Sequence, residues 1–151
     1  MKILLINPGN PVQSGRDLYT SDIHSALCRF TVNKKMCFGI PLALPTIAGI
    51  TPKQHTVKII DEMIETIDFD EKCDLVGITA MTYKATRAYE IAAVFRKHGV
   101  PVVMGGIHAS MCPEEAAKHV DCVVIGEADN LWPRLLEDFE RGNLLTQYKV
   151  E

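Results

Sequence analysis

Residues 75–106 read LVGITAMTYKATRAYEIAAVFRKHGVPVVMGG, and this stretch decides the fold. An apolar run at 75–78 precedes a segment, 85–97, whose apolar side chains recur at helical spacing, and a second apolar run follows at 102–104. Gly99 suits the position just after a helix. A strand, a helix and a strand in this order predict a βαβ unit, in which both strands run parallel in one sheet.

The same alternation extends to both sides of this unit. Three further runs are rich in apolar side chains, Ile3–Ile6, Val57–Ile60 and Cys122–Ile125, and most of the runs have them at consecutive positions, as is typical of strands buried on both faces. Helical patterns occupy residues 41–52, with Pro45 in the first turn, residues from Pro113 to Ala117, and residues 130–140, with Asp129 or Asn130 as the expected N-cap. The sequence therefore predicts an α/β fold with a five-stranded parallel sheet in the order 2-1-3-4-5 and helices on both faces.

Length and composition favour one ordinary domain, residues 1–151. The chain is 47% hydrophobic and 23% charged, which argues against a disordered or fibrous protein. A net charge of −3 lacks the basic excess of a nucleic-acid binder, so we expect no nucleic-acid partner. The five cysteines form no CxxC or other close pair, and the sequence shows neither a signal peptide nor an apolar run long enough to span a membrane. We expect reduced thiols, no membrane partner and a cytoplasmic location.

A long insert, residues 8–40, separates the first strand from its helix. Loops between a strand and a helix usually need only about 2–6 residues. Apolar positions between Ser21 and Phe30 recur at helical spacing, so the insert is expected to contain a short amphipathic helix and to act as a lid.

The unusual residues of the chain follow the predicted strands. In the order 2-1-3-4-5, ligands bind at the carboxyl ends of the strands, where the strand order reverses. The loops at that edge read NPGNP (7–11), TAMT (79–82), GGIHAS (105–110) and GEAD (126–129). Glycine and small hydroxyl residues allow close backbone approach and offer hydrogen bonds without bulk. These loops therefore favour a site for a bulky cofactor with a polar edge.

Six segments in a fixed order carry a resemblance to a known family. They are INP (6–8), VKIIDE (57–62), VGITAMT (76–82), RAYEIA (87–92), VPVVMGGIHASMCPEEA (100–116) and VIGEADNLWPRLLEDF (124–139). Together they resemble the N-terminal cobalamin-binding domain of B12-dependent radical SAM enzymes, from residue 2 to about residue 148.

The resemblance implies a Rossmann-like, flavodoxin-like three-layer sandwich that holds cobalamin. In that family a downstream barrel carries the [4Fe-4S] cluster and binds SAM through a CxxxCxxC motif, which this sequence lacks. The chain is therefore expected to be an excised domain of a longer protein, with cobalamin and that barrel as its partners. It would present the corrinoid to the barrel, for example for methyl transfer. It would hold no complete catalytic centre of its own, so its status as an enzyme stays open.

The resemblance places the cofactor contacts in the loops after the strands. These residues are Asn7, Pro8, Thr79, Met81, Thr82, Gly105, Gly106, His108, Gly126 and Glu127. The double glycine would make room for the nucleotide tail of the cofactor. No catalytic or metal-ligating residue is expected, because Asp22-Ile23-His24 imitates the cobalt-ligating D-x-H-x-x-G motif but Leu27 stands where the motif requires glycine.

Several of these positions also have ordinary structural interpretations. His108 could cap the following turn, and a double glycine suits a turn after any parallel strand. Thr79 and Thr82 could form an N-cap pair for the helix that starts at residue 85. Asp61 and Glu62 read as a solvated turn. Met81, Met104, Met111 and a half-buried Trp132 read as packing residues. Cys112 is a thiol at the start of a helix.

A different function class is a non-catalytic flavodoxin-like interaction or sensory domain, which would bind a smaller nucleotide or no cofactor. The sequence has no G-x-G-x-x-G after the first strand, no P-loop lysine and no phospho-receiver pattern of acids plus lysine. Fold alone does not separate the two classes.

Overall fold

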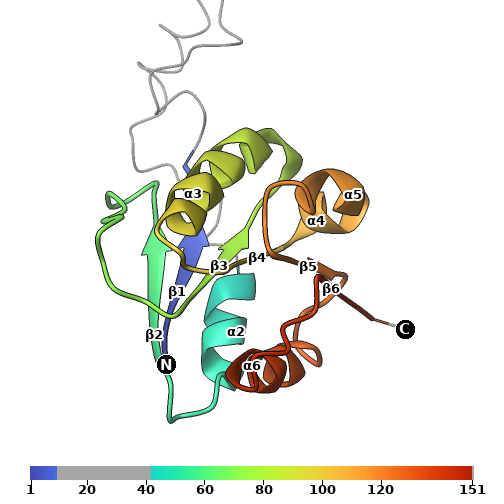
Figure 1. The fold of residues 1–151 in the computed structure, drawn as a ribbon. Helices are drawn as coiled ribbons and strands as arrows, with labels where there is room; N and C mark the ends of the chain where they lie inside the picture. Colours follow the sequence, from blue (N-terminus) through green and yellow to red (C-terminus); the bar gives the residue numbers. More distant parts are fainter. Residues whose placement is uncertain (10–41, 151) are drawn as a thin grey trace, which may run out of the picture.

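One parallel sheet organises the computed structural model, which describes residues 1–9 and 42–150 (Figure 1). The described strands follow the order β2-β1-β3-β4-β5-β6, and every neighbouring pair is parallel. Their bounds are β1 (Lys2–Asn7), β2 (Thr56–Asp61), β3 (Leu75–Thr79), β4 (Val102–Gly105), β5 (Cys122–Ile125) and β6 (Gln147–Lys149). The predicted order of the first five strands is confirmed, whereas the prediction of a five-stranded sheet is wrong.

The sequence does not predict the sixth strand, β6, because this segment has almost no apolar pattern. Tyr148 is its one buried residue and lies between the exposed Gln147 and Lys149. β6 pairs only with β5, at the edge of the sheet, so its outer side needs no apolar cover. A three-residue strand with polar ends cannot be distinguished from a loop by its sequence.

Helices cover both faces of the sheet and make the fold three-layered (Figure 1). Helices α3, α4 and α5 pack on one face, and α2 and α6 pack on the other. Their bounds are α2 (Ala43–Ile50), α3 (Ala85–Lys97), α4 (Ile107–Met111), α5 (Pro113–Ala116) and α6 (Trp132–Glu140), with a 3-10 turn η2 (Thr82–Lys84) before α3. The helices predicted over 41–52, 85–97, 113–117 and 130–140 are therefore confirmed, and α4 is an addition.

Trp132, at the start of α6, corrects one sequence-based interpretation. The sequence predicts a half-buried side chain, but Trp132 is 3% exposed, and its indole N–H donates to Thr51 Oγ1 at 2.8 Å. The indole lies over Gly77 in β3, where an added Cβ would be in ordinary contact with it at 3.7 Å; the tight contact at Gly77 is with a methyl carbon of Leu5, at 2.8 Å. The indole therefore packs against the sheet itself.

The predicted N-caps are also wrong. Helix α6 begins after Leu131 without a side-chain cap, so neither Asp129 nor Asn130 fills that role. Thr79 and Thr82 do not cap η2 or α3, whose N-cap residues are Met81 and Lys84 without side-chain hydrogen bonds. The lid of the 8–40 insert, its short helix and the histidine at position 24 lie outside the described residues, apart from Pro8 and Gly9.

No helix within residues 1–9 and 42–150 combines the length and apolarity needed to cross a membrane. The cytoplasmic location stays a prediction.

Candidate functional site

The loops singled out by the sequence meet at the carboxyl edge of the sheet. Ile6 pairs with Ile78, and Thr79 pairs with Gly105, so the loops after β1, β3 and β4 leave the sheet side by side. The β3 and β4 loops are also joined by backbone hydrogen bonds. The Ala80 amide donates to the Gly105 carbonyl (3.3 Å), and the His108 amide donates to the Ala80 carbonyl (3.0 Å).

Large apolar side chains are exposed on these two joined loops. Met81 and Tyr83 follow β3, and Ile107 and Met111 lie in α4 after β4; each is about half exposed or more. Met81 follows Ala80, and Ile107 precedes His108, so both lie next to the hydrogen bond from the His108 amide to the Ala80 carbonyl. Exposed apolar side chains on neighbouring loops favour contact with an apolar surface. Met104, by contrast, is fully buried in the core, as predicted.

The double glycine after β4 has two different roles. Gly106 has a φ of +90°, and a Cβ there would lie 2.7 Å from Thr79 Oγ1 and 3.1 Å from the Ala80 backbone. Gly105 has space, because its Cβ would lie 3.8 Å from Val124. The turn interpretation therefore accounts for Gly106, while contact of either glycine with a cofactor stays a prediction.

Ser110 joins the β4 and β5 loops and was missed by the sequence analysis. Its hydroxyl donates to the Gly106 carbonyl (3.0 Å) and accepts a hydrogen bond from the Gly126 amide (3.0 Å). Gly126 and Glu127 follow β5 and are exposed. A single serine in a short helix gives no sequence pattern that would reveal this link.

His108 is buried rather than a cap of the following turn. The residue is 3% exposed, and its Nε2 lies 2.7 Å from the hydroxyl of Tyr89, which also donates to Glu115 (3.2 Å). Burial and the neighbouring Glu115 raise the pKa of Tyr89, so the phenol keeps its proton. His108 Nδ1 is buried and has no hydrogen-bond partner in the described part of the chain.

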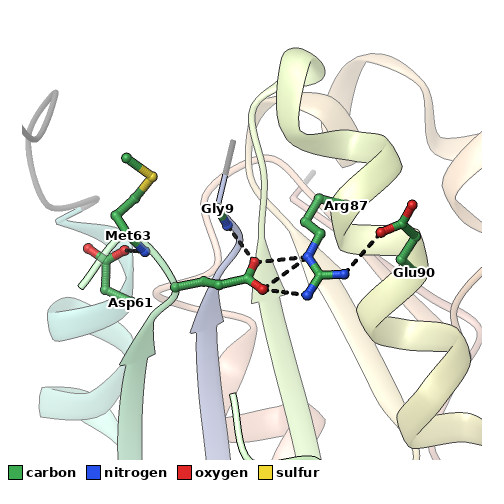
Figure 2. A network of polar contacts seen from close by, with 6 residues as sticks. Gly9, Asp61, Met63, Arg87 and Glu90 are labelled. Atoms are coloured by element: carbon green, nitrogen blue, oxygen red, sulfur yellow. Dashed lines mark hydrogen bonds and ion pairs between the residues drawn. The ribbon is translucent and has the colours of Figure 1, made fainter. Parts of the chain in front are cut away.

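A buried polar network lies where β1 and β2 end. The Asn7 amide donates to Asp61 Oδ1 (3.0 Å), and Lys84 Nζ donates to Asn7 Oδ1 (3.1 Å). The Met63 backbone amide also donates to Asp61 Oδ1 (2.9 Å), a contact drawn in Figure 2. The other carboxylate oxygen of Asp61, Oδ2, is buried without a partner among the described residues.

Glu62, the next residue, lies in a second network nearer the surface. The Gly9 amide donates to Glu62 Oε2 (2.7 Å), and Arg87 bonds both carboxylate oxygens, as Figure 2 shows. Burial alone would raise the pKa of Glu62, but the hydrogen bonds from Arg87 and Gly9 outweigh it and hold the pKa below its usual value. The interpretation of Asp61 and Glu62 as a solvated turn is wrong.

Residues 1–9 and 42–150 contain no group of three or more His, Cys, Asp and Glu side chains that could hold a metal ion. Cys73, Cys112 and Cys122 are free thiols, and burial raises the pKa of Cys73 to about 11 and that of Cys122 to about 12. All ten predicted contact residues lie at the carboxyl edge, either as the last residue of a strand (Asn7, Thr79 and Gly105) or in the segments that follow the strands. Their contact with a cofactor stays a prediction.

Comparison with known proteins identifies the family. The family model described as the B12 binding domain matches residues 37–136. The chain belongs to the B12-binding domain family. The matched range runs from before α2 into α6 and so includes the loops after β2, β3, β4 and β5. The cobalamin predicted from the sequence is the ligand of this family.

Curated relatives of this B12-binding domain are named as methyltransferases. Bacteriochlorophyllide d C-8(2)-methyltransferase of Chlorobaculum tepidum is 51% identical over 117 residues, which cover 77% of the chain and 26% of that protein. Bacteriochlorophyllide d C-12(1)-methyltransferase of the same organism is 35% identical, with 74% and 25% covered. An uncharacterized methyltransferase of Pyrococcus horikoshii is 33% identical, with 71% and 26% covered. The chain thus spans about a quarter of the length of these relatives.

Proposed function

We propose that this domain holds cobalamin over the carboxyl edge of its sheet and presents it to a radical SAM barrel elsewhere in a longer protein, for methyl transfer. The observation that carries the proposal is the B12-binding family match, whose range includes the loops where exposed apolar side chains gather. The iron–sulfur cluster and SAM would bind to the barrel.

The chemistry of the edge fits a corrinoid, which has a broad, largely apolar ring bordered by amide groups. Met81 and Ile107 offer apolar contact to the ring. Asp61 Oδ2 and His108 Nδ1 are buried polar atoms without partners among the described residues, and such atoms are costly unless a hydrogen-bonding group reaches them. The hydroxyls of Thr79 and Thr82 can serve the polar rim of the cofactor.

When bound, cobalamin supplies a cobalt-held methyl group for transfer. The described residues would bind and orient the cofactor, and no described residue is assigned a role as a catalytic acid, base or nucleophile. The relatives named for bacteriochlorophyllide methylation support a tetrapyrrole of that class as the methyl acceptor of the parent protein. The acceptor would bind outside this domain, which is built around the cofactor.

A thermal-shift experiment tests the cofactor assignment. A ligand at about 100 times its Kd stabilises the folded state by about 2.7 kcal/mol. For a domain of this size that corresponds to a rise in Tm of roughly 5–11 °C. We expect hydroxocobalamin to produce this rise and FMN, NAD and ATP to produce none. A rise with FMN and none with hydroxocobalamin would refute the proposal in favour of the flavodoxin-like alternative.

Two variants place the cofactor on the molecule. Met81→Ser and Ile107→Ser remove exposed apolar side chains from the carboxyl edge, so we expect a smaller shift with hydroxocobalamin and an unchanged Tm without it. Leu145→Ser is the matched control, because Leu145 is 45% exposed against 48% for Met81 but precedes β6 at the opposite edge. Equal shifts in all three variants would place the cofactor elsewhere.

A further inference from the structure

Two loops of the candidate site are tied to the end of one strand, β2. The Glu62 backbone amide donates to the Asn7 carbonyl (3.0 Å), and the Glu62 carboxylate accepts a hydrogen bond from the Gly9 amide (2.7 Å). Glu62 therefore bonds to Asn7 and to Gly9, the residues on either side of Pro8, at the point where the chain leaves β1. These bonds fix the first loop of the site relative to the sheet.

The same carboxylate binds the first turn of α3. Arg87 Nε lies 3.0 Å from both carboxylate oxygens of Glu62, Nη2 also bonds Oε1, and Nη1 donates to Glu90 (2.9 Å). The side chains of Glu62 and Arg87 are 16% and 19% exposed, so solvent screens this pair less than a surface ion pair. A guanidinium bonded to both oxygens also fixes the relative orientation of the two groups.

A second, buried connection runs parallel to the first. Lys84 Nζ donates to Asn7 Oδ1, and the Asn7 amide donates to Asp61. Lys84 and Arg87 both follow the 79–82 loop directly, so the start of α3 is held against the end of β1 at two levels. Figure 2 shows the outer level, with Arg87 reaching from α3 toward Gly9.

We propose that Glu62 and Arg87 are positioning residues that couple the 7–9 loop to the 79–82 loop and so set the width of the cofactor site. The predicted effect on cobalamin rests on the proposed function. Neither Glu62 nor Arg87 needs to touch the cofactor. Loss of the pair leaves only the inner connection through Lys84 and Asn7, so the two loops separate more readily, and binding then requires the coupled arrangement to be restored first. The apparent Kd then equals the intrinsic Kd divided by the fraction of molecules that keep the coupled arrangement.

Affinity for hydroxocobalamin is the first test. We expect Arg87→Gln to raise the Kd at least tenfold, and Arg87→Lys, which keeps the charge but not the planar fork, to have an intermediate effect. The matched control is Arg96→Gln on the last turn of the same helix, which breaks an ion pair with Asp121 far from the carboxyl edge. We expect its Kd within twofold of the parent. Equal effects of Arg87→Gln and Arg96→Gln on the Kd would overturn the proposal.

Amide hydrogen exchange without any cofactor is the second test. In Arg87→Gln and in Glu62→Gln we expect at least tenfold faster exchange at both Gly9, in the 7–9 loop, and Lys84, in η2, whose amide donates to Met81 of the 79–82 loop. Arg96→Gln should leave both rates unchanged. Faster exchange at Gly9 alone would overturn the coupling. If the parent chain does not bind hydroxocobalamin, the proposed function fails, while the exchange rates still decide whether these residues couple the loops.

Discussion

Replacing Gly106 by alanine tests whether the fold itself requires glycine at this position, independently of any ligand. The backbone at Gly106 has φ +90° and ψ −173°, a region that is essentially restricted to glycine and costs other residues about 1–3 kcal/mol. The new Cβ would also lie 2.7 Å from Thr79 Oγ1 and 3.1 Å from the Ala80 backbone, so the β3 loop must shift. Such overpacking costs about 1–3 kcal/mol more.

Gly106→Ala should therefore lower the free energy of unfolding by at least about 2 kcal/mol, which lowers Tm by roughly 4–8 °C or more. Gly105→Ala is the control, because its Cβ meets Val124 at an ordinary 3.8 Å and its φ is not positive. We expect that variant within about 1 kcal/mol of the parent. Urea unfolding monitored by circular dichroism measures both. Equal stability of the two variants would show that the turn at Gly106 does not need glycine.

Two further predictions concern stability. The folded-state pKa of Glu62 is lowered, so its contribution is fully present above the unfolded value near 4.5 and is lost as the pH falls through the folded value. Glu62→Gln should flatten the acid limb of stability against pH in urea titrations, and an unchanged limb would contradict the pairing with Arg87. Trp132→Phe removes the indole donor to Thr51 and should cost about 1–2 kcal/mol; a variant as stable as the parent would show that this bond contributes nothing.

Strands buried on both faces were predictable because their sequences differ clearly from those of loops. The runs at β1, β3, β4 and β5 contain consecutive β-branched or apolar residues, and each became a strand. β2 is an edge strand with exposed Thr56 and Lys58, and it was predictable from Val57, Ile59 and Ile60 alone. The edge strand β6 was not predictable, since a strand with one buried residue has no apolar run. Its burial depends on Tyr148 alone, whose hydroxyl donates to Asp138 on α6 (2.8 Å), a partner that sequence spacing does not reveal.

The polar networks at the carboxyl edge could not be predicted from the sequence for a different reason. Adjacent acids at a strand end look alike whether water or protein surrounds them, and the partners of Asp61 and Glu62 are Asn7 and Arg87, 54 and 25 positions away. Only the parallel pairing of β1 with β2 brings Asn7 beside Asp61. The sequence therefore predicts which loops meet at the carboxyl edge but not the contacts that hold them together.

The carboxyl edge separates side chains that shape the site from side chains that face outward. The His108 side chain contacts Tyr89 on α3, Ser110 bonds Gly106 and Gly126, and Gly106 is required by its own turn, so substitutions there change the fold together with any binding. Met81 and Ile107 are exposed, and their removal leaves every described hydrogen bond of the edge in place. Loss of cobalamin affinity in variants of Met81 or Ile107 therefore reports contact with the cofactor, whereas the same loss in a Gly106 variant would report damage to the loop that has to receive it.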